Sequence, residues 1–172
     1  RWQRDGELLG PDAFIAAAED SGLIAELGER VLSQVVVDAP RLAGGAGHPL
    51  TLGCNMSAHQ LRDPAFLGLV EQAVGALGEN RLVLEMTETV FVTADDETDC
   101  ALRTLTSLGA QLAIDDFGVG FSSIGYLQNL PVDILKIDRS FLRDIDLSPR
   151  AAALVDAIVV MGAALDLRVV AE

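Results

Sequence analysis

Several classes of protein are excluded by what this 172-residue sequence lacks. No apolar stretch approaches the ~20 residues that a membrane-spanning helix needs. The opening RWQRDGELLG has no basic segment followed by an apolar one, so no signal peptide is expected. The two cysteines, Cys54 and Cys100, do not have the spacing of a metal site. These absences predict a protein of the reducing cytoplasm, with any membrane anchor carried by other domains of the parent protein.

Basic residues are also scarce and are not clustered, and the net charge is −14. Binding of long nucleic acid depends on lysine and arginine that neutralise phosphates, so this partner is not expected. Direct contact of this segment with a membrane surface is not expected either, for the same reason. A small phosphorylated ligand remains compatible with the charge if metal ions supply the positive charge.

What the sequence does contain is a series of short apolar runs that each end in a polar residue. Each run has the length and aliphatic content of a buried strand, and each follows a helix-like segment. Alternating helices and strands predict a parallel sheet whose strands all end on the same side. The polar residues at the ends of the runs are Asn55, Glu85, Asp115 with Asp116, Lys136 and Glu172.

The predicted fold is therefore α/β and TIM-barrel-like, with about five parallel strands alternating with helices. A closed barrel of this kind needs eight strands, so residues 1–172 are expected to form part of a larger domain. No linker or low-complexity tract marks a second domain. The predicted strands are 50–55, 81–86, 110–115, 132–137 and 168–172. The predicted helices begin at Pro11 and cover 24–39, 64–77, 95–108, 124–127, 140–145 and 149–165, and a turn is predicted at 44–47.

In a barrel, these polar residues converge on the carboxyl rim, where barrel enzymes carry their active sites. Carboxylate and amide oxygens are the ligands that hard divalent ions prefer. The adjacent Asp115 and Asp116 suit a site for two ions, because strict alternation breaks down where a strand passes into a loop. Lys136 would orient an attacking hydroxide and add positive charge where the transition state is negative.

Each of these residues also has a purely structural interpretation. Asn55 at a strand end is typical of a helix or turn cap. The Asp115–Asp116 pair before Phe-Gly is also typical of a turn. Lys136 could pair with Asp133 or Asp138. The joint pattern of compatible ligands at successive strand ends favours the functional interpretation.

The motifs are specific enough to indicate a family. The stretches CNMSAHQL, LEMTET, DDFGVGFSS, LPVDILKIDRSF and LRVVAE, in this order, resemble the EAL-domain family of cyclic di-GMP phosphodiesterases. The opening segment resembles the one that follows the family's signature Glu-Ala-Leu. The resemblance covers essentially the whole chain. It implies a modified TIM barrel that linearises cyclic di-GMP to pGpG with two Mg²⁺ or Mn²⁺ ions.

The resemblance also implies roles for individual residues. Lys136 and Glu172 are the implied catalytic residues, with Lys136 near the attacking water. Glu88 is implied to steady the loop after Asp116. That loop, residues 117–123, lies at the family's dimer contact, which predicts a homodimer. The implied metal ligands are Asn55 and Glu85 for the first ion, Asp115 for both, and Asp116 and Glu172 for the second, and Arg1 is implied to contact a substrate phosphate.

The chain also departs from the family pattern. The signature glutamate, a ligand of the first ion, would lie upstream of Arg1, and the family's segment after Val-Ala-Glu would follow Glu172. Three strands of the barrel are missing on this alignment, so the fragment alone is expected to be inactive or nearly so. The alternative is a catalytically degenerate EAL domain that senses cyclic di-GMP or binds proteins. A different metal-dependent barrel hydrolase is disfavoured by the order of the motifs.

Overall fold

A parallel sheet forms the centre of the computed structural model, which describes residues 1–88, 90, 95–118 and 127–171. The sheet has five strands in the order β3-β4-β5-β6-β7, so neighbours in sequence are neighbours in space. This confirms the predicted α/β class. The strands are β3 (Thr51–Asn55), β4 (Arg81–Thr87), β5 (Gln111–Phe117), β6 (Ile134–Ile137) and β7 (Arg168–Ala171).

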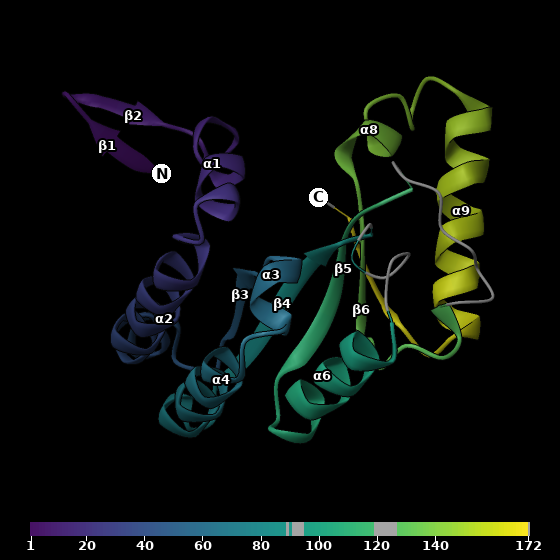
Figure 1. The fold of residues 1–172 in the computed structure, drawn as a ribbon. Coiled ribbons are helices and arrows are strands. Elements are labelled where there is room, and N and C mark those ends of the chain that lie inside the picture. The colour runs from purple at the N-terminus through teal and green to yellow at the C-terminus, as the bar shows by residue number, and fades with distance from the viewer. Residues whose placement is uncertain (89, 91–94, 119–126, 172) are drawn as a thin grey trace.

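Helices connect these strands and cover one face of the sheet (Figure 1). Right-handed crossovers between sequential parallel strands place every connecting helix on the same side. Among the described residues, no helix combines the length and apolar character required to cross a bilayer. The long helices are α2 (Ile24–Ala46), α4 (Pro64–Leu77), α6 (Asp96–Ser107) and α9 (Pro149–Ala164), and the short ones are α3 (Ala58–Leu61) and α8 (Arg139–Leu142).

Alternation along the strands gives the sheet two different faces. The residues that point toward the helices are almost completely buried, and they form the main core with the apolar faces of α4, α6 and α9. The opposite face carries a small separate cluster of Val83, Ala113 and Ile134. The main-core residues on the strands include Leu82, Leu84, Met86, Leu112, Ile114, Leu135 and Ile137.

Helix α2 differs from the prediction at its carboxyl end. A turn was predicted at 44–47, but the helix runs through Gly44 and Gly45 to Ala46. Only Gly47 leaves the helical region, with φ of 72°. One left-handed glycine is sufficient to end a helix, and the preceding glycines are tolerated in its last turn. The turn predicted at 44–47 was therefore wrong for residues 44–46, which are helical. The predicted helical piece at 124–127 lies outside the described residues apart from Leu127.

An N-terminal arm, residues 1–22, projects from the sheet (Figure 1). It contains the hairpin of β1 (Trp2–Arg4) and β2 (Glu7–Leu9), which was not predicted, then the 3₁₀ turn η1 (Pro11–Ala13) and α1 (Ile15–Asp20). The helix predicted from Pro11 is thus split in two. Asp5 and Gly6 both have positive φ, which fits a two-residue hairpin turn. The rings of Trp2 and Phe14 meet edge to face at 5.9 Å and hold the hairpin on α1.

The contact between α9 and β7 leads to a stability prediction. Gly162 is buried, and a Cβ at this position would overlap Val169 Cγ2. Gly162→Ala is expected to lower the free energy of unfolding by about 1–3 kcal/mol through overpacking. Gly75 on α4 faces open space, so Gly75→Ala is expected to raise it by about 0.5–1 kcal/mol. Urea unfolding of both variants checks this, and shifts of the same sign would contradict it.

Candidate functional site

Three charged side chains meet at the carboxyl ends of neighbouring strands. Lys136 Nζ lies 2.6 Å from Glu85 Oε2 and 3.0 Å from Asp115 Oδ1. The side chains of Lys136, Glu85 and Asp115 are only 11 %, 17 % and 15 % exposed. Charged groups this far out of water are usually paired, and here one ammonium group holds two carboxylates. The structure therefore brings these three sequence-predicted site residues together.

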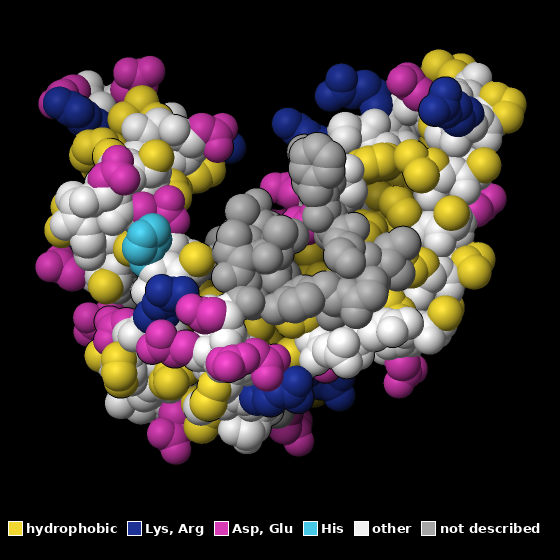
Figure 2. Space-filling view, turned by 45° about the vertical axis from the view of Figure 1, so that its right-hand side comes forward, with side chains coloured by type: hydrophobic (Ala, Val, Ile, Leu, Met, Phe, Trp, Pro, Cys, Tyr) yellow, Lys and Arg dark blue, Asp and Glu magenta, His cyan; other side chains and the backbone are white. Residues whose placement is uncertain are grey.

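Strand alternation explains why these three residues share one face. Each lies two residues after a member of the small apolar cluster Val83, Ala113 and Ile134. Residues two apart on a strand point to the same side, so the apolar cluster forms a floor beneath the charged groups. In Figure 1 the carboxyl ends of β4, β5 and β6 point toward the space between the N-terminal arm and α8. Figure 2 shows that the molecule is hollowed between these two parts.

Strand β3 contributes two features beside Glu85. Asn55 is paired in register with Glu85, and the N–H of Met56 donates to the Glu85 carbonyl at 2.8 Å. Gly53 lies two residues before Asn55, and a Cβ on it would overlap Glu85 Oε1. The missing side chain at Gly53 therefore leaves the space that the Glu85 carboxylate occupies. Asn55 itself is exposed on the next strand end.

A β-bulge separates Asp115 from Asp116. Ile114 pairs with Leu135 and Phe117 pairs with Ile137, so the two aspartates lie opposite the single residue Lys136. Asp116 has a φ of 53° and is exposed. Its N–H donates to Asp115 Oδ1 at 3.0 Å. The predicted break in alternation is present as this bulge.

Glu88 lies behind the bulge and contacts the start of the following loop. The residue is 5 % exposed, and its Oε2 accepts a hydrogen bond from the Gly118 N–H at 3.1 Å. Gly118 has a φ of 99°, a conformation that favours glycine. Residues 119–123, the rest of the loop in the sequence prediction, lie outside the described residues.

The alternative partners considered for Lys136 are engaged elsewhere. Asp133 Oδ2 accepts the Leu112 N–H at 2.9 Å, which ties β6 to β5. Asp138 Oδ1 accepts the Ser140 N–H at 2.9 Å and caps α8. Hydrogen bonds to Ser140 hold the pKa of the Asp138 carboxyl below its ordinary value. Lys136 pairs across the sheet with Glu85 and Asp115 instead.

Cys54 adjoins the site without joining its charged cluster. It is 6 % exposed and lies on the helix side of β3. Burial, with a smaller contribution from the Glu85 carboxylate, raises the pKa of the thiol from 9.0 to about 11. The group therefore stays protonated at neutral pH and is a poor metal ligand in this state.

The structure does not bring every predicted site residue to this cluster. Arg1 is exposed at the open end of the β1–β2 hairpin, beside Gly10, and Glu172 lies outside the described residues. Within the described ranges, no group of three or more histidine, cysteine or acidic side chains is close enough to hold a metal ion. The carboxylates that converge on Lys136 are Glu85 and Asp115.

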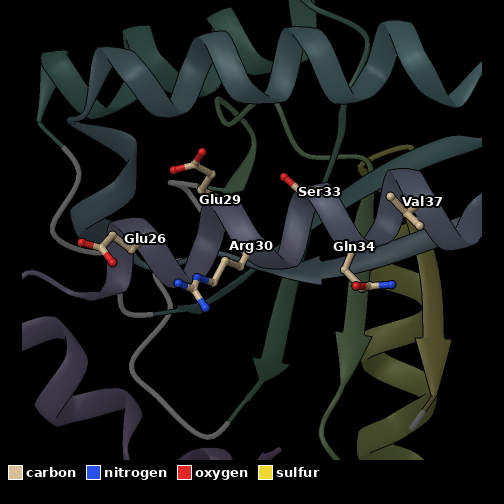
Figure 3. Close-up of a pocket in the computed structure, with 6 residues that line it drawn as sticks. All are labelled: Glu26, Glu29, Arg30, Ser33, Gln34 and Val37. Atoms are coloured by element: carbon tan, nitrogen blue, oxygen red, sulfur yellow. The ribbon is translucent and has the colours of Figure 1, made fainter.

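A cavity of about 720 Å³ lies away from the strand ends, along α2. Its described lining comes from one stripe of that helix: Glu26, Glu29, Arg30, Ser33, Gln34 and Val37. Figure 3 shows that these side chains spread along the helix surface and do not converge on a common point. The strand-end cluster, rather than this cavity, is the candidate functional site.

Comparisons with known proteins indicate the family of the chain. The family model described as "EAL domain" matches residues 1–172. The chain is 39 % identical over 175 residues to cyclic di-GMP phosphodiesterase NbdA of Pseudomonas aeruginosa, covering all of this chain and 22 % of NbdA. It is 37 % identical over 175 residues to cyclic di-GMP phosphodiesterase PdeR of Escherichia coli, covering all of this chain and 26 % of PdeR.

A solved structure is similar as well. The complex described as "PaMucR Phosphodiesterase, c-di-GMP complex" superposes with a TM-score of 0.83 at 35 % identity, covering 98 % of this chain and 69 % of that one. The chain thus spans about a quarter or less of the curated relatives and most of the superposed domain. Sequence motifs, sheet topology and these similarities lead to one conclusion: the chain belongs to the EAL-domain family.

Proposed function

We propose that the chain is the larger part of a domain that hydrolyses cyclic di-GMP to linear pGpG. The observation that carries the proposal is the ion-paired cluster of Glu85, Lys136 and Asp115 at adjacent strand ends of an EAL fold. Two similar relatives are named cyclic di-GMP phosphodiesterases, which supports the choice of substrate.

The donor set at the strand ends fits divalent metal ions. It offers carboxylate and amide oxygens, the ligands of Mg²⁺ and Mn²⁺, while the neighbouring thiol of Cys54 stays protonated. When bound, two such ions would supply positive charge to the phosphate and acidify a water molecule. The proposed ligands are Asn55, Glu85, Asp115, Asp116 and Glu172.

The remaining residues act through charge and position. Lys136 directs its ammonium group into the cluster, where it would donate a hydrogen bond to the attacking oxygen and counter the negative charge of the transition state. Glu88 holds the backbone of Gly118 and so steadies the start of the following loop. We assign substrate-phosphate contact to Arg1 and a catalytic role to Glu172 on the family pattern.

The test is an assay of the parent protein and of the 172-residue chain with cyclic di-GMP and Mg²⁺ or Mn²⁺. The parent is expected to release pGpG, and chelation of the metal is expected to stop the reaction. The 172-residue chain is expected to be nearly inactive. In the part of the chain that the structure describes, the sheet is open at the edge strand β3, so no further strand beside Asn55 supplies the remaining ligand proposed for the first ion. Binding of cyclic di-GMP by the parent without hydrolysis would overturn the proposal and assign the sensor alternative.

We also propose a homodimer formed through the region 117–123, and the cytoplasm as its location. Only Phe117 and Gly118 of this region are described, and Gly118 lies against Phe141 of α8. Light scattering of the parent protein with ligand measures the state, and a monomer at high concentration would refute the dimer.

A further inference from the structure

The N-terminal arm is held to the rest of the molecule with little apolar burial. Residues 1–23 are all described, and none of them is buried. The first buried side chain of the chain is Ile24, at the start of α2. Segments with few buried apolar contacts open at low free energy unless other bonds hold them. The position of this arm therefore depends strongly on its polar contacts.

Those polar contacts converge on Glu19, in the last turn of α1. The Ser57 hydroxyl donates to Glu19 Oε1 at 2.6 Å. His59 Nδ1 lies 4.0 Å from the same oxygen. Among the described residues, no other side chain of the arm forms a hydrogen bond or ion pair with a residue beyond α2. The Glu19 side chain is 32 % exposed, so this bond is partly shielded from water.

The location of Glu19 is unfavourable for α1 itself. A carboxylate near the carboxyl end of a helix opposes the helix dipole, and Asp20 adds a second one. Local preferences that are broken in this way are expected where a residue serves a contact outside its own element. For Glu19 that contact is Ser57.

Ser57 leads directly to the candidate site. It lies two residues after Asn55, and the intervening Met56 donates its N–H to the Glu85 carbonyl at 2.8 Å. Ser57 is also fixed in place, because its N–H donates to Gln60 Oε1 at 3.0 Å in a capping box at the start of α3. A rigid backbone segment therefore joins the Glu19 contact to Asn55 and Glu85.

We propose that Glu19 is a positioning residue that sets the N-terminal arm against the strand-end site through Ser57. At the amino end of α1, Trp2 packs on Phe14, and Arg1, the residue before Trp2, lies beside Gly10. This inference rests on the proposed function, in which Arg1 contacts a substrate phosphate. Glu19 then determines how well the arm presents Arg1 to the substrate, without touching the substrate itself.

The experiment compares Glu19→Ala, Glu19→Gln and Asp20→Ala in the parent protein. Asp20 is the matched control, because it is an exposed acidic neighbour on the same helix with no described partner. Without substrate, Glu19→Ala is expected to speed amide hydrogen exchange in residues 15–20 by about tenfold, since it removes a hydrogen bond to a charged group. Glu19→Gln retains an acceptor for the Ser57 hydroxyl and is expected to restore most of the protection.

The kinetic readout separates positioning from general instability. Glu19→Ala is expected to raise KM for cyclic di-GMP by about tenfold with kcat within about twofold, because the weakened contact concerns substrate binding. In a Ser57→Ala background, Glu19→Ala is expected to add little, since the partner is already gone. If Glu19→Ala matches Asp20→Ala in exchange and in KM, the proposal is wrong.

The two proposals fail in different ways. A parent protein that never hydrolyses cyclic di-GMP would contradict the proposed function. The difference in amide hydrogen exchange between Glu19→Ala and Asp20→Ala would still show whether the contact of Glu19 with Ser57 holds the arm. Slower exchange in Glu19→Gln than in Glu19→Ala supports the contact even if the alanine variant is poorly folded. Equal, fast exchange in both overturns it.

Discussion

Glu85→Gln in the parent protein is expected to reduce hydrolysis of cyclic di-GMP by more than about a hundredfold. Substituting residues that only orient a metal ligand already lowers activity or metal affinity by about 10–100-fold, and Glu85 is a proposed ligand itself. The substitution keeps the size of the side chain, so the space above Gly53 stays filled. It removes the negative charge that pairs with Lys136 and that is proposed to bind an ion. Initial rates of pGpG release measure the effect.

A matched control for this variant is Glu71→Gln, the same chemical change on the exposed face of α4. This control is expected to leave the rate unchanged within experimental error. Far-ultraviolet circular dichroism and urea unfolding show whether the Glu85 variant keeps its fold. Hydrolysis by a folded Glu85→Gln protein within threefold of wild type would count against the site.

Lys136→Met is expected to have the largest effect on stability. The side chains of Glu85 and Asp115 are 17 % and 15 % exposed. Without Lys136 the two carboxylates would repel each other, and water would screen this repulsion only weakly. Removing one partner of a buried ion pair typically lowers the free energy of unfolding by about 3–5 kcal/mol. Added Mn²⁺ or Mg²⁺ is expected to recover part of this loss, because cations would replace the ammonium group. Urea unfolding in chelator and in excess metal measures both quantities.

Arg103→Met provides the comparison. Arg103 Nε lies 2.8 Å from Asp99 Oδ2, but these side chains are 58 % and 38 % exposed. Exposed pairs contribute about 0–1 kcal/mol, so this variant is expected to change stability little. Equal destabilisation by Lys136→Met and Arg103→Met would show that the strand-end cluster is not a buried ionic centre.

The framework of the site could be predicted from sequence because its strands are short apolar runs that end in polar residues. Leu84, Ile114 and Leu135 are apolar and face the helices in the main core. Alternation along the strands then places Glu85, Asp115 and Lys136 on the other face. The pairing of Lys136 with Glu85 and Asp115 could not be predicted, because Asp133 and Asp138 lie much nearer to Lys136 in sequence.

Other features could not be predicted for physical reasons. The hairpin strands of the N-terminal arm have three residues each, too few to show a periodicity. Helix α2 continues past Gly44 because two glycines weaken a helix without ending it. The contact between Glu19 and Ser57 joins residues far apart in the chain, and neither sequence pattern nor propensity reports such a pair.

The extra residue at the β5 bulge controls which way the following chain faces. With Asp116 inserted, Phe117 returns to the helix side, where it is 6 % exposed. If Asp115, Asp116 and Phe117 instead alternated strictly, the phenylalanine ring would lie on the same face as Lys136 and shut out an anionic guest. The bulge therefore lets β5 carry two consecutive carboxylates opposite Lys136 without changing the face on which the following residue lies.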